Sequence, residues 1–133
     1  MSFRFEKLEI WKLAREFTVE IYKLTRGFPK DELFSLSAQM RRAAISVALN
    51  ITEGSDRKSD IEFKRFLRMS LASLEEVITG LYIAFDQGFI NKKDFNSLYY
   101  EFSFYLFSSL LLPSHSLIII SVQILKNDFN KLV

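Results

Sequence analysis

The chain has 133 residues, which is enough for one domain built around one hydrophobic core. Hydrophobic residues make up 49% and charged residues 26%, a balance that is typical of a globular protein and argues against a disordered chain. There is no Cys, which excludes disulfides and thiolate metal sites, and the net charge of only +2 excludes a strongly basic protein. The N-terminus mixes acids with bases and has no apolar core, so it is not a signal peptide; we expect a cytoplasmic protein with a single domain over residues 1–133.

The chain has only two Pro and four Gly, the residues that most often interrupt helices, so long helices are expected. A first helix is predicted from about Phe5 to Arg26, because apolar residues recur along it at helical spacing. Gly27 and Pro29 then end that helix, and the acidic pair Asp31 and Glu32 favours a new N-terminus. The core stripe of the first helix consists of Ile10, Leu13, Ala14, Phe17, Ile21, Leu24 and Phe28.

The second helix is predicted from about Asp31 to Glu53 and carries two stripes. Its apolar stripe is Leu33, Leu36, Met40, Ala44, Val47 and Ile51. Its polar stripe is Gln39, Arg42, Ser46, Asn50 and Glu53. We interpret the polar stripe as a structural hydrogen-bonded network that fixes helix register or subunit packing, since a partly buried Arg42 needs a carboxylate partner. Glu53 is the nearest acid in sequence, although it has an alternative partner in Arg57 at i+4.

A third helix is predicted from about Ser59 to Gln87, opened by the capping box Ser59-Asp60-Ile61-Glu62. Its core stripe consists of Phe63, Phe66, Leu67, Ser70, Leu74, Val77, Ile78, Leu81 and Phe85. A fourth helix follows a cap at Asn91–Asp94. The four Gly are isolated and are interpreted as helix terminators, which leaves no phosphate-binding loop. Because the connections are short, the predicted fold is all-α: an up-down-up-down antiparallel four-helix bundle.

The C-terminal end departs from this pattern, since residues 102–125 carry no Asp, Glu, Lys or Arg. That length is enough to span a bilayer, but six Ser and a central Pro113 argue against a membrane span. We expect the fourth helix to break near Pro113 and residues 114–127 to form an extra C-terminal segment.

No catalytic or metal-binding motif emerges from the sequence. The adjacent acids Glu75 and Glu76 fall on the wet side of the third helix, and the single His115 has no acidic neighbour close in sequence. We therefore expect a protein that is not an enzyme and that uses no metal or other cofactor.

The positive charge is concentrated in the middle of the chain. Residues 41–68 contain seven basic and four acidic side chains, a net +3, whereas residues 1–40 carry +1 and residues 69–133 carry −2. The predicted nucleic-acid-binding residues are Arg57, Lys58, Lys64, Arg65 and Arg68, with Arg41 as a more distant candidate. Their role would be to neutralise phosphates. The alternative is an ordinary solvated face, partly neutralised by Asp56, Asp60 and Glu62.

The stretch QMRRAAISVALNITEG at 39–54 carries a family resemblance, supported by FEKLEIWKLA at 5–14, IYKLTRGFPKDELFSL at 21–36 and RKSDIEFKRFLRMSLASLEE at 57–76. These segments, with the turn GFI at 88–90, resemble the bacterial 23S ribosomal RNA intervening-sequence proteins, a four-helix bundle family. That family is also similar to the accessory protein of diversity-generating retroelements, a pentameric bundle that binds nucleic acid and a reverse transcriptase. The resemblance implies a four-helix bundle, a ring-shaped homopentamer and contact with nucleic acid.

Two functions from different classes follow. The first is a non-enzymatic oligomer that binds RNA or DNA, with structured RNA expected, through the basic cluster. The alternative is a protein-interaction scaffold whose oligomer surface or uncharged C-terminal tail binds a partner protein.

Overall fold

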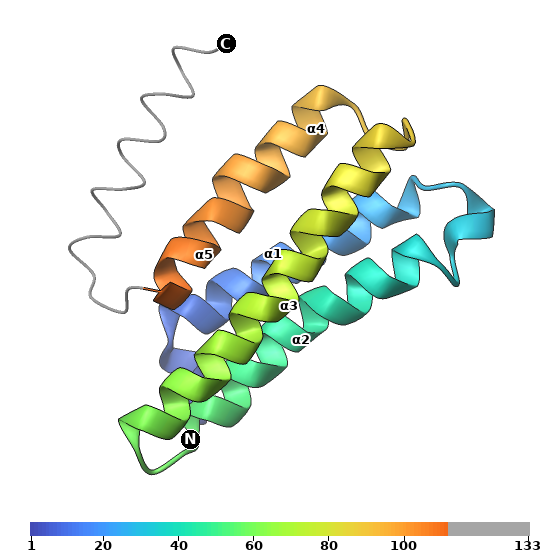
Figure 1. Ribbon diagram of the computed structural model, residues 1–133. Coiled ribbons are helices and arrows are strands. Elements are labelled where there is room, and N and C mark those ends of the chain that lie inside the picture. The colour runs from blue at the N-terminus through green and yellow to red at the C-terminus, as the bar shows by residue number, and fades with distance from the viewer. Residues whose placement is uncertain (112–133) are drawn as a thin grey trace.

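The computed structural model describes residues 1–111, which form helices and no strand. Three long helices, α1 (Glu9–Arg26), α2 (Leu36–Ser55) and α3 (Asp60–Asp86), are followed by a fourth that consists of α4 (Lys92–Asn96), a π-helical stretch η3 (Ser97–Ser103) and α5 (Phe104–Leu111). Short 3-10 turns, η1 (Arg4–Lys7) and η2 (Lys30–Glu32), precede α1 and α2. Successive long helices run in opposite directions (Figure 1). The predicted four-helix bundle is confirmed.

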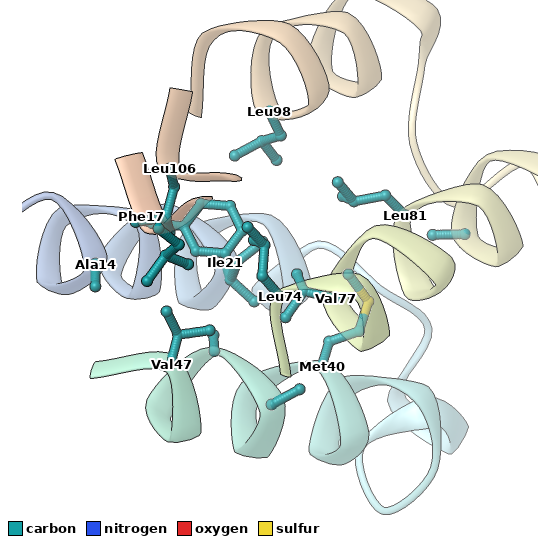
Figure 2. Close-up of a cluster of buried hydrophobic side chains, with 14 of the residues drawn as sticks. Ala14, Phe17, Ile21, Met40, Val47, Leu74, Val77, Leu81, Leu98 and Leu106 are labelled. Carbon is teal, nitrogen blue, oxygen red and sulfur yellow. The ribbon is translucent and has the colours of Figure 1, made fainter. Parts of the chain in front are cut away.

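The helices surround one core. α1 packs on α2, α2 packs most extensively on α3, and the fourth helix closes the bundle against α3 and α1. Fully buried side chains from all four helices meet at the centre of the bundle (Figure 2): Ala14, Phe17, Ile21, Met40, Val47, Leu74, Val77, Leu81 and Leu106. Each large apolar side chain buried in this way stabilises the fold by about 1.5–3 kcal/mol. The predicted core stripes of the first and third helices supply most of these positions.

The predicted start of the second helix was wrong. The chain makes a 3-10 turn at Lys30–Glu32, and α2 begins five residues after Asp31, at Leu36. The reason is local, because the Glu32 carboxylate accepts a hydrogen bond from the Leu36 backbone N–H at 3.3 Å and so caps α2 from outside. Leu33, predicted to belong to the apolar stripe, is exposed, and Phe34 beside it is 92% exposed.

The predicted start of the first helix was also early. Phe5 lies in η1, Leu8 is extended, and α1 begins at Glu9. At the other end of the bundle the termination of α3 was predicted correctly. Gly88 has φ +75° and follows the last residues of α3, while the Phe89 N–H bonds to the Ala84 carbonyl oxygen at 2.8 Å.

Two glycines allow helices to approach closely, and one of them, Gly80, was wrongly interpreted as a helix terminator. Gly54 is the second-to-last residue of α2, close to the predicted end of that helix, and an added Cβ there would come within 2.6 Å of the Phe66 Cβ on α3. Gly80 lies inside α3, where an added Cβ would come within 2.5 Å of the Met40 Cγ on α2. Both contacts join α2 to α3, so these glycines set the close packing of the two longest helices.

The fourth helix contains a π turn that the sequence pattern did not reveal. The Ser103 hydroxyl donates a hydrogen bond to the Leu98 carbonyl oxygen, five residues earlier, at 2.8 Å. The wider turn accommodates a five-residue step between the buried positions Leu98 and Ser103, after which Leu106 and Leu110 resume helical spacing. The predicted break at Pro113 and the extra segment 114–127 lie outside the described residues.

Candidate nucleic-acid interface

The turn between α2 and α3 lies at one end of the bundle and carries the first two predicted cations (Figure 1). Hydrogen bonds from the Asp56 and Arg57 N–H groups to the carbonyls of Glu53 and Gly54 tighten the end of α2. Ser59 then caps α3, since its hydroxyl accepts the Glu62 N–H at 3.2 Å. The predicted N-terminal cap at Ser59 is thus confirmed.

Arg57 is held against the bundle. Its guanidinium donates to the Glu53 carboxylate at 2.7 Å, which confirms the i+4 pairing as the partner of Glu53. The same guanidinium lies 4.7 Å from the centre of the Phe66 ring, and that of Arg65 lies 5.8 Å from it. The buried Phe66 ring is therefore a platform for two arginines, and its faces are not available to a ligand.

The remaining cations project outward. Lys58, Lys64, Arg65 and Arg68 are all exposed, and none forms an ion pair within residues 1–111. Lys64, Arg65 and Arg68 share one face of α3 because they are spaced at i, i+1 and i+4. We call Arg57, Lys58, Lys64, Arg65 and Arg68 the basic surface. With the exposed acids Asp56, Asp60 and Glu62, residues 56–68 carry five positive and three negative charges, a net +2.

The charge changes sign along α3. Glu75 and Glu76, two turns beyond Arg68, are exposed as predicted. One end of the bundle is therefore positive, and the outward face of α3 becomes acidic toward its middle. The bundle topology adds two cations that were not predicted from the sequence, because the start of α1 lies at the same end as the α2–α3 turn. These are the exposed Arg4 and Lys7 of η1, which packs on α2; Glu6 lies between them, so η1 adds a net charge of +1.

Arg41 is not part of this surface. It lies in the first half of α2, about four helical turns from Arg57, which corresponds to about 20 Å along the helix. Its Nε donates to the Thr25 hydroxyl at 2.8 Å, and its guanidinium lies 4.7 Å from the Tyr22 ring centre. Arg41 therefore joins α2 to α1.

The polar stripe of α2 divides into two parts. Ser46 accepts from the Ser73 hydroxyl of α3 at 2.9 Å, and the Asn50 amide donates to the Ser46 carbonyl at 2.9 Å and its hydroxyl at 3.1 Å. Gln39 and Arg42 are exposed and hydrogen-bond to no side chain among the described residues. The stripe thus links α2 to α3 only in its middle, and Arg42 is not the partly buried arginine that was expected.

Several exposed apolar side chains were not predicted from the pattern. Ile61 is 83% exposed in the first turn of α3, and Leu49 is 60% exposed on α2. The exposure of Leu49 could have been predicted, because Leu49 falls on neither stripe of its helix. The exposure of Ile61 was not evident from the pattern, because Ile61 lies inside the capping box.

An aromatic cluster covers the opposite end of the bundle, where α3 meets α4 and η3. Tyr82 lies 5.0 Å from Phe95 and 5.8 Å from Tyr99 between ring centres, and Phe85 lies 5.3 Å from Phe95. Phe85 was predicted to belong to the core but is 40% exposed, since α3 ends one residue beyond it. Hydrogen bonding to Tyr82, together with partial burial, raises the pKa of Tyr99 above its ordinary value.

Residues 1–111 contain no group of three or more His, Asp or Glu side chains placed to hold a metal ion. No helix in this part of the chain is both long and apolar enough to cross a membrane.

The fold and this surface define a class: an all-helical four-helix bundle with a positive end. Residues 6–104 match the family described as 23S rRNA-intervening sequence protein, so the chain belongs to that family. The family is named for intervening sequences of 23S ribosomal RNA, which points to an RNA-related role. No curated protein matches the chain.

Proposed function

We propose that this protein is a non-enzymatic RNA-binding module that contacts phosphates of structured RNA through the basic surface. The observation that carries the proposal is the set of outward-facing cations Lys58, Lys64, Arg65 and Arg68 at one end of the bundle, none of which forms an ion pair within residues 1–111. The RNA-related name of the family supports the choice of ligand.

The chemistry of the surface suits phosphate binding. Lys and Arg side chains that neutralise phosphates release condensed counterions, and this release supplies most of the affinity for a nucleic acid backbone. Arg65 rests on the Phe66 ring and keeps its N–H groups free for phosphate oxygens. Arg57 is partly committed to Glu53, so its contribution to RNA binding is expected to be smaller.

The test is the salt dependence of RNA binding. Fluorescence anisotropy of the purified protein with a labelled hairpin RNA should show affinity falling roughly 100-fold between about 50 and 200 mM salt, as three or four phosphate contacts require. Absence of binding at the lower salt concentration, or affinity independent of salt, would contradict the proposal.

We also propose that the chain assembles as a homo-oligomer through the outer face of α2, the homopentamer being the state that the family resemblance implies. Ile45 and Leu49 are 37% and 60% exposed and lie one turn apart on that face. They line a shallow groove whose other residues are Tyr22, Ala38, Arg41, Arg42 and Ser46. An oligomer would repeat the basic surface and strengthen its field.

Replacing Leu49 with Asp should dissociate this oligomer, because a charged carboxylate would replace the most exposed aliphatic side chain of the proposed interface in every subunit. Sedimentation velocity should show a monomer for Leu49→Asp and the wild-type oligomer for the matched control Ile83→Asp, which alters an exposed aliphatic side chain of α3. A monomeric wild-type protein, or an unchanged oligomer of the Leu49 variant, would exclude this interface.

The scaffold function has one specific observation in its favour. The half-exposed aromatic cluster of Tyr82, Phe85, Phe95 and Tyr99 has the composition of protein interfaces, in which Tyr and Phe are enriched. Failure of the RNA titration at low salt would leave the scaffold as the better-supported function.

A further inference from the structure

Ile61 lies in the first turn of α3, just after the turn that carries Arg57 and Lys58. It is 83% exposed, and Lys64, Arg65 and Arg68 follow it on the same helix at three, four and seven residues. Positions three and four residues apart on a helix are neighbours, with Cβ atoms about 5–6 Å apart. Lys64, Arg65 and Ile61 therefore share one outward face of α3.

An exposed aliphatic side chain is ordinary on a protein surface, so its surroundings decide its meaning. The bundle cannot take up Ile61, because the buried face of α3 lies on the opposite side, at Phe66, Leu67 and Ser70. The immediate chain neighbours of Ile61 are the exposed carboxylates Asp60 and Glu62. A phosphate directly over Ile61 would be repelled by these two acids, whereas an uncharged group there would not.

We propose that Ile61 packs against the face of an unpaired base while the flanking phosphates lie on Lys58, Lys64 and Arg65. The ligand is then an RNA with a bulge or loop whose base can leave the helical stack. This inference rests on the proposed RNA binding and specifies the form of RNA that the surface selects.

The chemistry of RNA favours this ligand over a continuous duplex. The major groove of an A-form helix is deep and narrow, and its minor groove presents sugar hydroxyls, so neither offers an apolar surface to Ile61. Unpaired bases in loops and bulges expose their faces, and covering such a face removes apolar surface from water. Glu62 lies beside that position, where its carboxylate can accept a hydrogen bond from a base amino group.

A membrane surface is the other ligand that combines negative charge with apolar contacts. A helix that lies in a membrane interface needs a broad apolar face, and the apolar face of α3 is buried in the bundle. A single exposed Ile61 is too little apolar surface for that role.

The experiment uses two labelled hairpin RNAs of equal nucleotide composition, one with a continuous stem and one with a bulge in the stem. The wild-type protein should prefer the bulged hairpin by about tenfold, as expected for burial of one aliphatic side chain. Ile61→Ala should remove this preference and leave affinity for the continuous stem within about twofold, since alanine suits a helix better than isoleucine and the phosphate contacts remain. Ile83→Ala, which alters an exposed isoleucine far along the same helix, should keep the preference.

Equal affinity of the wild-type protein for both hairpins, or a preference that survives in Ile61→Ala, would overturn this inference and leave the proposed RNA binding intact. Binding to neither hairpin at low salt would overturn both. Cosedimentation with vesicles rich in phosphatidylserine gives the remaining outcome: membrane binding that depends on Ile61, with RNA binding that does not, would overturn the base-packing proposal.

Discussion

Replacing Lys64, Arg65 and Arg68 together with alanine should weaken binding to a hairpin RNA by about 100- to 1,000-fold at about 50 mM salt, because three phosphate contacts are lost. The slope of log affinity against log salt should become shallower by about 2–3 for the same reason. Fluorescence anisotropy across a salt series measures both quantities. All three side chains are exposed, so the free energy of unfolding should change by less than about 1 kcal/mol.

The chain offers a control with the same loss of charge. Lys30, Lys92 and Lys93 are exposed and lie at the opposite end of the bundle, in the η2 turn and the first turn of α4 (Figure 1). Their triple alanine variant should keep most of the RNA affinity. Equal weakening by the two triple variants would mean that net charge, and not the basic surface, determines binding. Full affinity of the Lys64, Arg65 and Arg68 variant would place the RNA elsewhere.

The sequence predicted those features that depend on the period of the helix. Phe17, Ile21, Leu74 and Leu81 were assigned to the core because apolar residues recur every three or four positions, and all four are fully buried. The same period places the basic side chains of α3 on the outward face, where the structure has them. The Ser59 cap could also be predicted from the sequence, because its hydrogen bond joins residues three apart in the chain.

The features that were missed depend on contacts between helices. Arg41 was predicted as a candidate for nucleic-acid binding, but its side chain contacts Thr25 and Tyr22 on α1. Gly54 and Gly80 were interpreted as helix terminators, but each faces a side chain of the neighbouring helix. No local pattern identifies such partners, because they become neighbours only when the bundle forms.

The grouping of Arg4 and Lys7 with the basic surface has the same origin. These cations are about 50 residues from Arg57 in the chain, and the antiparallel order of α1, α2 and α3 brings them to one end. This grouping could have been predicted from the bundle topology, because the start of the first helix and the junction of the second and third helices lie at the same end of an up-down bundle.

Gly54→Ala should lower the free energy of unfolding by about 2–3 kcal/mol, although alanine has the higher helix propensity by about 1 kcal/mol. The new methyl group would lie 2.6 Å from the Phe66 Cβ and 2.9 Å from the Phe63 Cδ2. A Cβ atom is fixed to the backbone, so Phe66 can yield only if α3 moves away from α2. Urea denaturation measures the change.

The same substitution at other glycines calibrates this effect. Gly27→Ala should change stability by less than about 0.5 kcal/mol, because the nearest atom to its added Cβ is 3.5 Å away and the residue is exposed. Gly80→Ala should fall between the two, because the obstructing Met40 side chain is flexible but fully buried. A Gly54 variant as stable as the wild type would show that α2 and α3 do not pack this closely at the turn.

The position of Gly54 links this stability effect to RNA binding. Phe66, which the new methyl group would displace, is the platform for Arg57 and Arg65. Gly54→Ala should therefore weaken RNA binding under conditions in which the variant is still folded. Gly80→Ala should not, because Gly80 lies more than three turns beyond Phe66 along α3. Equal RNA affinity of the two variants would mean that the arginines act without support from the Phe66 ring.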